Sequence, residues 1–294
     1  MENHSRDQII GSKDAPYITQ LAHSYTSADG YHDAFVHPSE PNYLFMAAGE
    51  NFDILDDDDP ASHPIDATGH IADQLEEAGL TWKSYQEGMG DPCGLKSHGR
   101  YAAKHNPFVY FNNINGWDGT QMNPTARCLN SVVDFSNLAT DIAAGTVPNY
   151  AFITPDLDDD MHDGSIGDGD QWLAKVIPQI QASAAYQNGG VIFLLWDEGG
   201  GYPAGDDPPF IVISEHAKKG FVSYEDYDQS NYLKTVEVML GVANLPCDSE
   251  RDGITSMDEM FADPIAPLPT TTPNGSGNGP VDQTSAAAAA SAIL

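Results

Sequence analysis

The sequence predicts an α/β protein with a doubly wound, mostly parallel sheet and helices on both faces. Strand and helix signals alternate along residues 1–266, which is the order of elements that builds a parallel sheet. The run VIFLLW at 191–196 is continuously apolar, as expected of a strand that is covered on both faces. The chain has 294 residues, of which 40% are hydrophobic, so it can bury a sizeable core.

Short runs rich in β-branched and aromatic residues predict strands at 31–36, 81–86, 109–111, 150–154, 191–196 and 209–213. Apolar residues at helical spacing predict helices at 16–25, 40–48, 67–79, 129–143, 170–184 and 230–241. Ligands of such sheets bind beyond the carboxyl ends of the strands. We therefore expect the functional residues in the segments that directly follow the predicted strands.

The composition changes at Pro267, and we expect one domain over 1–266 followed by a tail over 267–294. The tail is rich in Pro, Thr, Gly and Ala and has no hydrophobic period until its last residues. Such a segment cannot bury enough surface to order itself, so we expect it to be disordered. Asn274 begins a glycosylation sequon, and the alanine-rich end could anchor the chain to a cell surface.

The charge excludes several classes of partner. There are 44 acidic and 12 basic side chains, which gives a net charge of −32. Phosphate backbones and anionic membranes would repel such a chain, so we expect no nucleic-acid partner. Apolar stretches stay well short of the ~18 residues that a transmembrane helix requires. Three cysteines permit one disulfide with one thiol left over, and the first residues, MENHSRDQIIGS, show no signal peptide.

A serine stands at the predicted start of a helix, directly after the first predicted strand. Ser39 lies in HPSEPNY at 37–43. Free N–H groups and the positive dipole end at a helix start suit a phosphoryl group. Ser39 could therefore act as a nucleophile, with Asn42 as a donor to the developing charge. The alternative is that Ser39 simply caps the helix.

Two acidic segments follow later strands. Residues 156–163, within TPDLDDDMHDG, contain five aspartates and His162, a mixture of ligands that suits a divalent cation. The alternative there is a solvated acidic turn. Asp197 and Glu198 directly follow VIFLLW, and adjacent carboxylates at the end of a buried strand are costly unless they are paired or bind a cation. The alternative for this pair is a helix cap with a flexible glycine turn.

Together these segments resemble the phosphoesterase family of acid phosphatases and phosphatidylcholine-type phospholipases C, in the alkaline-phosphatase-like superfamily. The resemblance covers roughly Met1 to Leu245. It rests on ENHS at 2–5, APY at 15–17, HPSEPNY at 37–43, YAAKHNPFVYF at 101–111, TPDLDDDMHDG at 154–164, GDQWL at 169–173, WDEGG at 196–200 and KTVEVMLG at 234–241. The order and spacing of all these motifs make the match more specific than any one of them.

The resemblance implies a phosphoesterase in which Ser39 attacks phosphorus and forms a phosphoserine. It implies that Asn42 and His37 orient the phosphoryl oxygens, and that His162 or His105 is the acid for the leaving group. The implied metal shell is Glu2, Asn3, Asp197 and Glu198, with Asp160 completing the far side. For His105 a structural, hydrogen-bonded histidine is an equal alternative. The cation could be Ca²⁺, Mg²⁺, Zn²⁺ or Mn²⁺.

The chain departs from the family pattern in three places. The family usually has an apolar strand directly before ENHS, so we expect the first central strand to be missing and the domain to be truncated at its N-terminus. Gln229 stands where the family often has a histidine. Asp156 stands where the family often has asparagine.

Three functions follow from these observations. The first is a metal-dependent, acid phosphatase-like hydrolase of small phosphate esters that works through a phosphoserine. The second is a phospholipase C-type phosphodiesterase. The third is a non-catalytic, acidic cation-binding pseudo-enzyme. The resemblance, the sequon and the tail lead us to expect an extracellular or cell-surface location.

Overall fold

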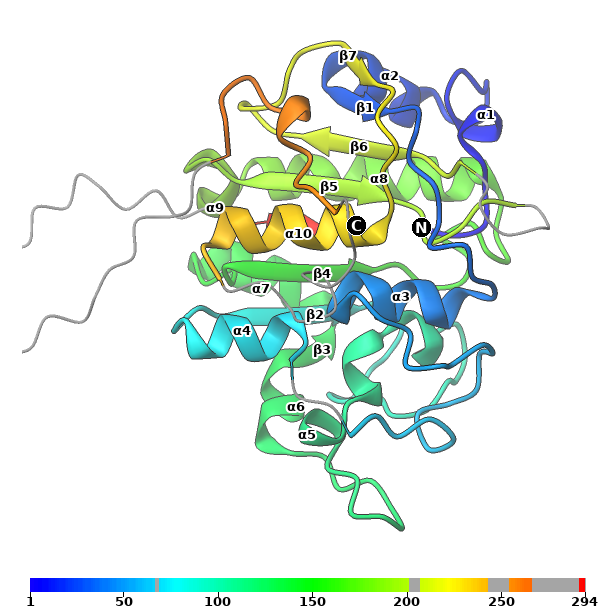
Figure 1. Cartoon of the computed structure of the whole chain (residues 1–294), viewed down its shortest axis with the longest axis vertical. Helices are drawn as coiled ribbons and strands as arrows, with labels where there is room; N and C mark the ends of the chain where they lie inside the picture. Colours follow the sequence, from blue (N-terminus) through cyan, green and yellow to red (C-terminus); the bar gives the residue numbers. More distant parts are fainter. Residues whose placement is uncertain (67–68, 201–206, 243–253, 266–290, 294) are drawn as a thin grey trace, which may run out of the picture.

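The computed structural model describes residues 1–66, 69–200, 207–242, 254–265 and 291–293. Its described strands form one sheet in the order β3-β2-β4-β8-β5-β6-β1-β7 (Figure 1). Neighbouring strands from β3 to β5 run parallel, whereas β6 is antiparallel to both β5 and β1. This confirms the mostly parallel sheet. The strands are β1 Thr26–Ala28, β2 Trp82–Gln86, β3 Val132–Asp134, β4 Tyr150–Thr154, β5 Val191–Leu195, β6 Phe210–Ile213, β7 Phe221–Ser223 and β8 Ser291–Ile293.

Helices cover both faces of the sheet, as predicted. Alternate side chains of β5 enter two separate cores, Phe193 with α3, α4 and α10 on one face and Ile192 with α2 and α8 on the other. The α-helices are α1 Arg6–Ile9, α2 Pro16–Ser24, α3 Ser39–Ala48, α4 Ile71–Glu77, α5 Asn112–Asn115, α6 Ala126–Ser131, α7 Ser136–Ala144, α8 Ile166–Gln181, α9 Ala184–Gln187 and α10 Gln229–Leu240. Short 3₁₀ turns are η1 Ala103–His105, η2 Pro107–Tyr110 and η3 Asp258–Met260. Within the described residues no helix is long and apolar enough to span a membrane.

Local signals set the ends of the main helices. Ser165 caps α8 by accepting from the N–H of Asp168, and the Asp168 side chain accepts from the N–H of Ser165 in return. Asp228 caps α10 by accepting from the N–H groups of the first turn. Helix α3 ends at Gly49, whose φ of 71° is the left-handed conformation that glycine adopts without a steric cost.

Three predicted elements were wrong. Residues 31–36 are irregular, because Phe35 has a φ of 59° that a strand cannot accommodate, and the strand lies earlier, at β1. The predicted strand 109–111 falls largely in η2, where the apolar run packs as a 3₁₀ turn. The predicted helix 129–143 is divided into α6, β3 and α7, because the β-branched pair in VVD extends the parallel sheet beside β2.

Two segments of the chain lie between β4 and β5: strand β8 and the N-terminal residue Met1. Strand β8 pairs in parallel with the first halves of both strands. Beyond it, Met1 lies beside the end of β5, where its nitrogen donates to the carbonyl of Leu195 at 3.3 Å and its carbonyl accepts from the N–H of Asp197 at 3.1 Å. The chain therefore enters the carboxyl edge of the sheet at Glu2. Of the predicted tail 267–294 the structure describes only the three residues of β8.

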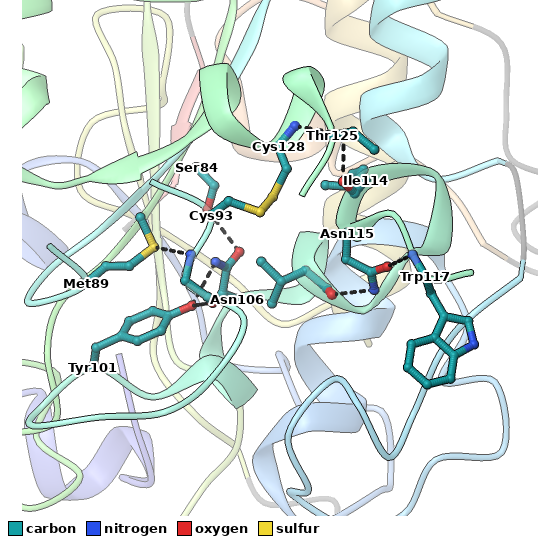
Figure 2. Close-up of a disulfide and its surroundings, with 12 residues drawn as sticks. Ser84, Met89, Cys93, Tyr101, Asn106, Ile114, Asn115, Trp117, Thr125 and Cys128 are labelled. Carbon is teal, nitrogen blue, oxygen red and sulfur yellow. Dashed lines mark hydrogen bonds between the residues drawn. A yellow bond between two sulfur atoms is a disulfide. The ribbon is translucent and has the colours of Figure 1, made fainter. Parts of the chain in front are cut away.

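A disulfide fastens the loop that follows β2. Cys93 and Cys128, separated by 35 residues, join this loop to α6, and Cys247 lies outside the described residues (Figure 2). Closing a loop of this length stabilises a fold by about 3–4 kcal/mol in the chain-entropy picture. Next to the disulfide, Asn106 donates to the Tyr101 hydroxyl at 3.1 Å and accepts from Ser84 at 3.2 Å. These bonds fix the segment 101–106 against β2.

Candidate active site

The candidate residues meet at the carboxyl edge of the sheet. Helix α3 begins there with Ser39, and the segments that leave β4 and β5 carry Asp160 and Asp197 to the same place. Glu2 arrives from between these two strands, and its N–H donates to the carbonyl of Asp160 at 2.8 Å. The site is therefore where a doubly wound fold is expected to bind a ligand.

Ser39 has a carboxylate within hydrogen-bond distance. Its Oγ donates to Oε2 of Glu2 at 3.1 Å, and the hydroxyl of Tyr43 donates to Oε1 of the same carboxylate. Burial, and next the charge of Asp160, raise the pKa of Glu2 to about 8. The N-cap residue of α3 is Pro38, and the Ser39 hydroxyl is directed to Glu2, which argues against a purely capping role. A hydroxyl at a helix start with a proton acceptor beside it is the geometry of an activated nucleophile.

Asn42 lies one turn into α3 and is hydrogen bonded to Glu198, beyond β5, and to Gln229, at the start of α10. Its Nδ2 donates to the carbonyl of Val36 at 2.9 Å and to Oε2 of Glu198 at 3.3 Å. Its Oδ1 accepts from Nε2 of Gln229 at 3.2 Å, and this Nε2 also donates to the carbonyl of Asp197 at 2.7 Å. Gln229, noted in the sequence only as a departure from a pattern, therefore fixes Asn42 relative to Asp197.

His37 lies between two carboxylates. Its Nε2 is 3.0 Å from Oδ2 of Asp33, and its Nδ1 is 3.5 Å from Oε2 of Glu198. The ring is thus oriented by the buried Asp33, which sequence reasoning missed. An isolated aspartate in an irregular segment carries no spacing signal that would have marked it.

The predicted metal shell contains buried oxygens without hydrogen-bond partners. Both carboxylate oxygens of Asp197 and the amide oxygen of Asn3 are of this kind. Burial, and next the charge of Glu2, raise the pKa of Asp197 well above its ordinary value. Burial and then Asp197 raise the pKa of Glu198 to about 9. Unpaired buried oxygens are costly, and a divalent cation would satisfy them, so the residues fit such a group.

His105 lies between Glu2 and Asp160. Its Nε2 is 3.5 Å from Oε1 of Glu2, and its Nδ1 is 3.2 Å from Oδ2 of Asp160. These three side chains could also hold a metal ion, since their ligand atoms lie within 4.8 Å of one another. Burial raises the pKa of Asp160 to about 7 and lowers the pKa of His105 well below its ordinary value. His105 is therefore neutral at physiological pH.

His162 lies on the more open side. Its backbone N–H donates to Oδ1 of Asp160 at 2.7 Å, and its ring Nδ1 is 2.8 Å from Oδ1 of Asp163. Its Nε2 faces Nζ of Lys104 at 3.3 Å. All ten residues named from the sequence thus occur in this region. Tyr43 and Lys104, which also belong to it, were missed although they stand inside the quoted motifs HPSEPNY and YAAKHNPFVYF.

The raised carboxyl pKa values predict that the metal-free protein loses stability as pH rises. Glu2 and Asp160 keep their protons in the folded state up to about pH 8 and 7, whereas in the unfolded chain they ionise near 4.5 and 3.8. The free energy of unfolding therefore falls as the pH rises from about 3.8 to about 8. In chelator, we expect the Tm to fall by at least about 5 °C over this range. Glu2→Gln should flatten the fall, and a Tm that rises would contradict the assignment.

Comparison with known proteins agrees with this geometry. The family model described as the phosphoesterase family matches residues 8–243. The chain belongs to the phosphoesterase family. It is 32% identical over 82% of its length to a phosphatidylinositol-3-phosphatase of Mycobacterium tuberculosis, of which it covers 75%. It is 27% identical to a probable acid phosphatase of Kluyveromyces lactis, covering 89% of this chain and 61% of that one.

More distant relatives of this phosphoesterase include phosphodiester hydrolases. A non-hemolytic phospholipase C of Burkholderia pseudomallei is 25% identical over 68% of the chain, which spans only 31% of that enzyme. The family thus places the chain among the phosphoric ester hydrolases. Among solved structures, the phosphonate monoester hydrolase of Silicibacter pomeroyi aligns with a TM-score of 0.55 at 14% identity, over 89% of this chain and 75% of that one. This likeness shows the shared fold.

Proposed function

We propose that this phosphoesterase is a metal-dependent, acid phosphatase-like hydrolase of small phosphate esters that works through a phosphoserine. The observation that carries the proposal is the Ser39 hydroxyl at the start of α3, hydrogen bonded to Glu2 and surrounded by buried carboxylates. The Mycobacterium and Kluyveromyces relatives, both named as phosphatases, support a phosphate ester as the substrate.

In the proposed reaction Glu2 would be kept ionised by the cation, and Ser39 Oγ attacks phosphorus while Glu2 Oε2, which accepts its hydrogen bond, takes the serine proton. The P–O bond to the leaving group breaks, and His162 supplies the proton that makes this group an alcohol. His105 is neutral and fully enclosed, so it positions Glu2 and Asp160. Asn42 and His37 orient the phosphoryl oxygens. Water then attacks the phosphoserine and releases phosphate.

The cation would be held by Asn3, Asp197 and Glu198, with Glu2 and Asp160 completing the shell. When bound, it supplies positive charge that favours the serine alkoxide and the transition-state oxygens. We propose Ca²⁺, Mg²⁺, Zn²⁺ or Mn²⁺, because oxygen ligands with a nearby imidazole suit all four. The unpaired oxygens of Asp197 and Asn3 would serve a non-catalytic cation binder equally well. The Ser39 hydroxyl, hydrogen bonded to Glu2, supports the catalytic function over that alternative.

Further proposals concern the whole chain. We propose an alkaline-phosphatase-like domain over 1–266, supported by the mostly parallel sheet with helices on both faces. We propose an extracellular or surface location, with anchoring through the tail, because the Cys93–Cys128 disulfide is typical of oxidising compartments. The phospholipase relatives support a diesterase as the second candidate.

The deciding experiment is hydrolysis of p-nitrophenyl phosphate and of its phosphorylcholine ester from about pH 4 to 8. We expect faster hydrolysis of the monoester, with the optimum on the acid side. Faster hydrolysis of the phosphorylcholine ester would favour the diesterase, and hydrolysis of neither ester by folded protein would favour the cation binder.

A further inference from the structure

Lys104 brings a positive charge into a strongly anionic site. It stands in η1, which packs against α3, and its Nζ is 2.7 Å from Oδ2 of Asp57 and 3.3 Å from Nε2 of His162. Burial lowers the pKa of Lys104, but the hydrogen bond and charge of Asp57, with the charges of Glu2 and Asp197, raise it overall. The side chain therefore stays protonated.

Asp57 connects this lysine to the nucleophile's own helix. One carboxylate oxygen accepts from Lys104, and the other accepts from the N–H of Glu40 at 3.0 Å. Glu40 directly follows Ser39, so two hydrogen bonds join the ammonium to the first turn of α3. The surrounding bonds also hold η1 itself, because Asn106 bonds to Ser84 and Tyr101 (Figure 2).

The position of the Lys104 ammonium beside the acidic residues affects which phosphate esters the site would accept. With a divalent cation bound, Glu2, Asp160, Asp197 and Glu198 would be ionised, and their four negative charges would exceed the two positive charges of the cation. The site would then repel an anion, and each additional negative charge on the substrate would increase this repulsion. A phosphate monoester carries two negative charges at neutral pH, whereas a diester carries one. A fixed ammonium close to the nucleophile offsets the second charge, and it can donate hydrogen bonds to a phosphoryl oxygen.

We propose that Lys104 binds a phosphoryl oxygen and makes the site select phosphate monoester dianions over diesters, with Asp57 as its positioning residue. The inference rests on the proposed phosphate ester hydrolysis and narrows its substrate class. Nζ of Lys104 moves from His162 to the phosphoryl oxygen when substrate binds.

The test compares Lys104→Gln with wild type on p-nitrophenyl phosphate and bis(p-nitrophenyl) phosphate at pH 7, with Mg²⁺ and separately with Ca²⁺. We expect kcat/KM for the monoester to fall about 10- to 100-fold, the range of a lost charge-assisted hydrogen bond. The diester value should change by less than about 3-fold. Lys104→Arg should recover part of the monoester preference. Lys13→Gln removes an exposed lysine and should change neither value.

An equal loss on both esters would overturn the proposal, because damage to the fold or to Ser39 lowers both together. If Lys104→Gln does not fold, the double variant with Asp57→Asn removes both charges of the ion pair and should show the same selectivity loss. Calorimetric binding of inorganic phosphate tests the role of Lys104 separately from the proposed phosphate ester hydrolysis. If the Kd of inorganic phosphate is about 10-fold lower for wild type than for Lys104→Gln, Lys104 binds the phosphoryl group, even if neither protein hydrolyses an ester. Equal binding, or none, refutes it.

Discussion

Ser39→Ala should abolish hydrolysis of p-nitrophenyl phosphate. Removing the Oγ that donates to Glu2 leaves no atom at the start of α3 to attack phosphorus. Loss of a covalent nucleophile typically lowers kcat by at least about 10³-fold. The fold should persist, because the N-cap position of α3 is occupied by Pro38 and not by Ser39. The measurement is the initial rate of p-nitrophenol release, with the Tm as the check on folding.

Ser136→Ala is the matched control. Ser136 is likewise the first residue of a helix, α7, and its hydroxyl donates to Asp134 away from the site. This variant should retain the wild-type rate. If Ser39→Ala kept more than about a tenth of wild-type activity, the phosphoserine pathway would be excluded, and direct attack by water would have to be considered.

Asp197→Asn should have opposite effects on the metal-free and the metal-bound protein. Without metal, folding must keep Asp197 protonated at neutral pH, because burial and the charge of Glu2 raise its pKa well above its ordinary value. The amide has no such cost, so the Tm of the variant at neutral pH should rise. Saturating cation at about 100 times its Kd should stabilise wild type by about 2.7 kcal/mol, or about 5–10 °C. The variant should show little of this increase, and its hydrolysis rate should match that of chelator-treated wild type.

Asp170→Asn is the control, because it replaces a buried aspartate outside the proposed metal shell. Asp170 is also buried, but both its oxygens accept from backbone N–H groups at the start of α2. This variant should lose stability without metal and should keep the full cation-induced shift in Tm. A cation shift that survives in Asp197→Asn would show that Asp197 is not a ligand.

The sequence by itself determined the fold class and most of the motifs. Strand β5 was predictable because five successive buried side chains require apolar residues on both faces. Most of α8 was predictable from its apolar period, but the helix begins at Ile166 and not at residue 170, because Ser165 caps it. Asp197 could be named because it lies just beyond β5, where this fold binds ligands. Ser39 was named from its place at a helix start, although the strand predicted directly before it is absent.

Only the tertiary structure decided how these residues act together. Lys104 and Asp57 are 47 residues apart, and Gln229 is 187 residues from Asn42, so no local spacing could pair them. The neutral state of His105 depends on burial that is created by elements distant in sequence. Residues 132–134 became a strand because β2 offered a free edge. Sequence patterns record local conformation and the faces that must be buried, whereas charge, exposure and hydrogen-bond partners at the site arise from packing.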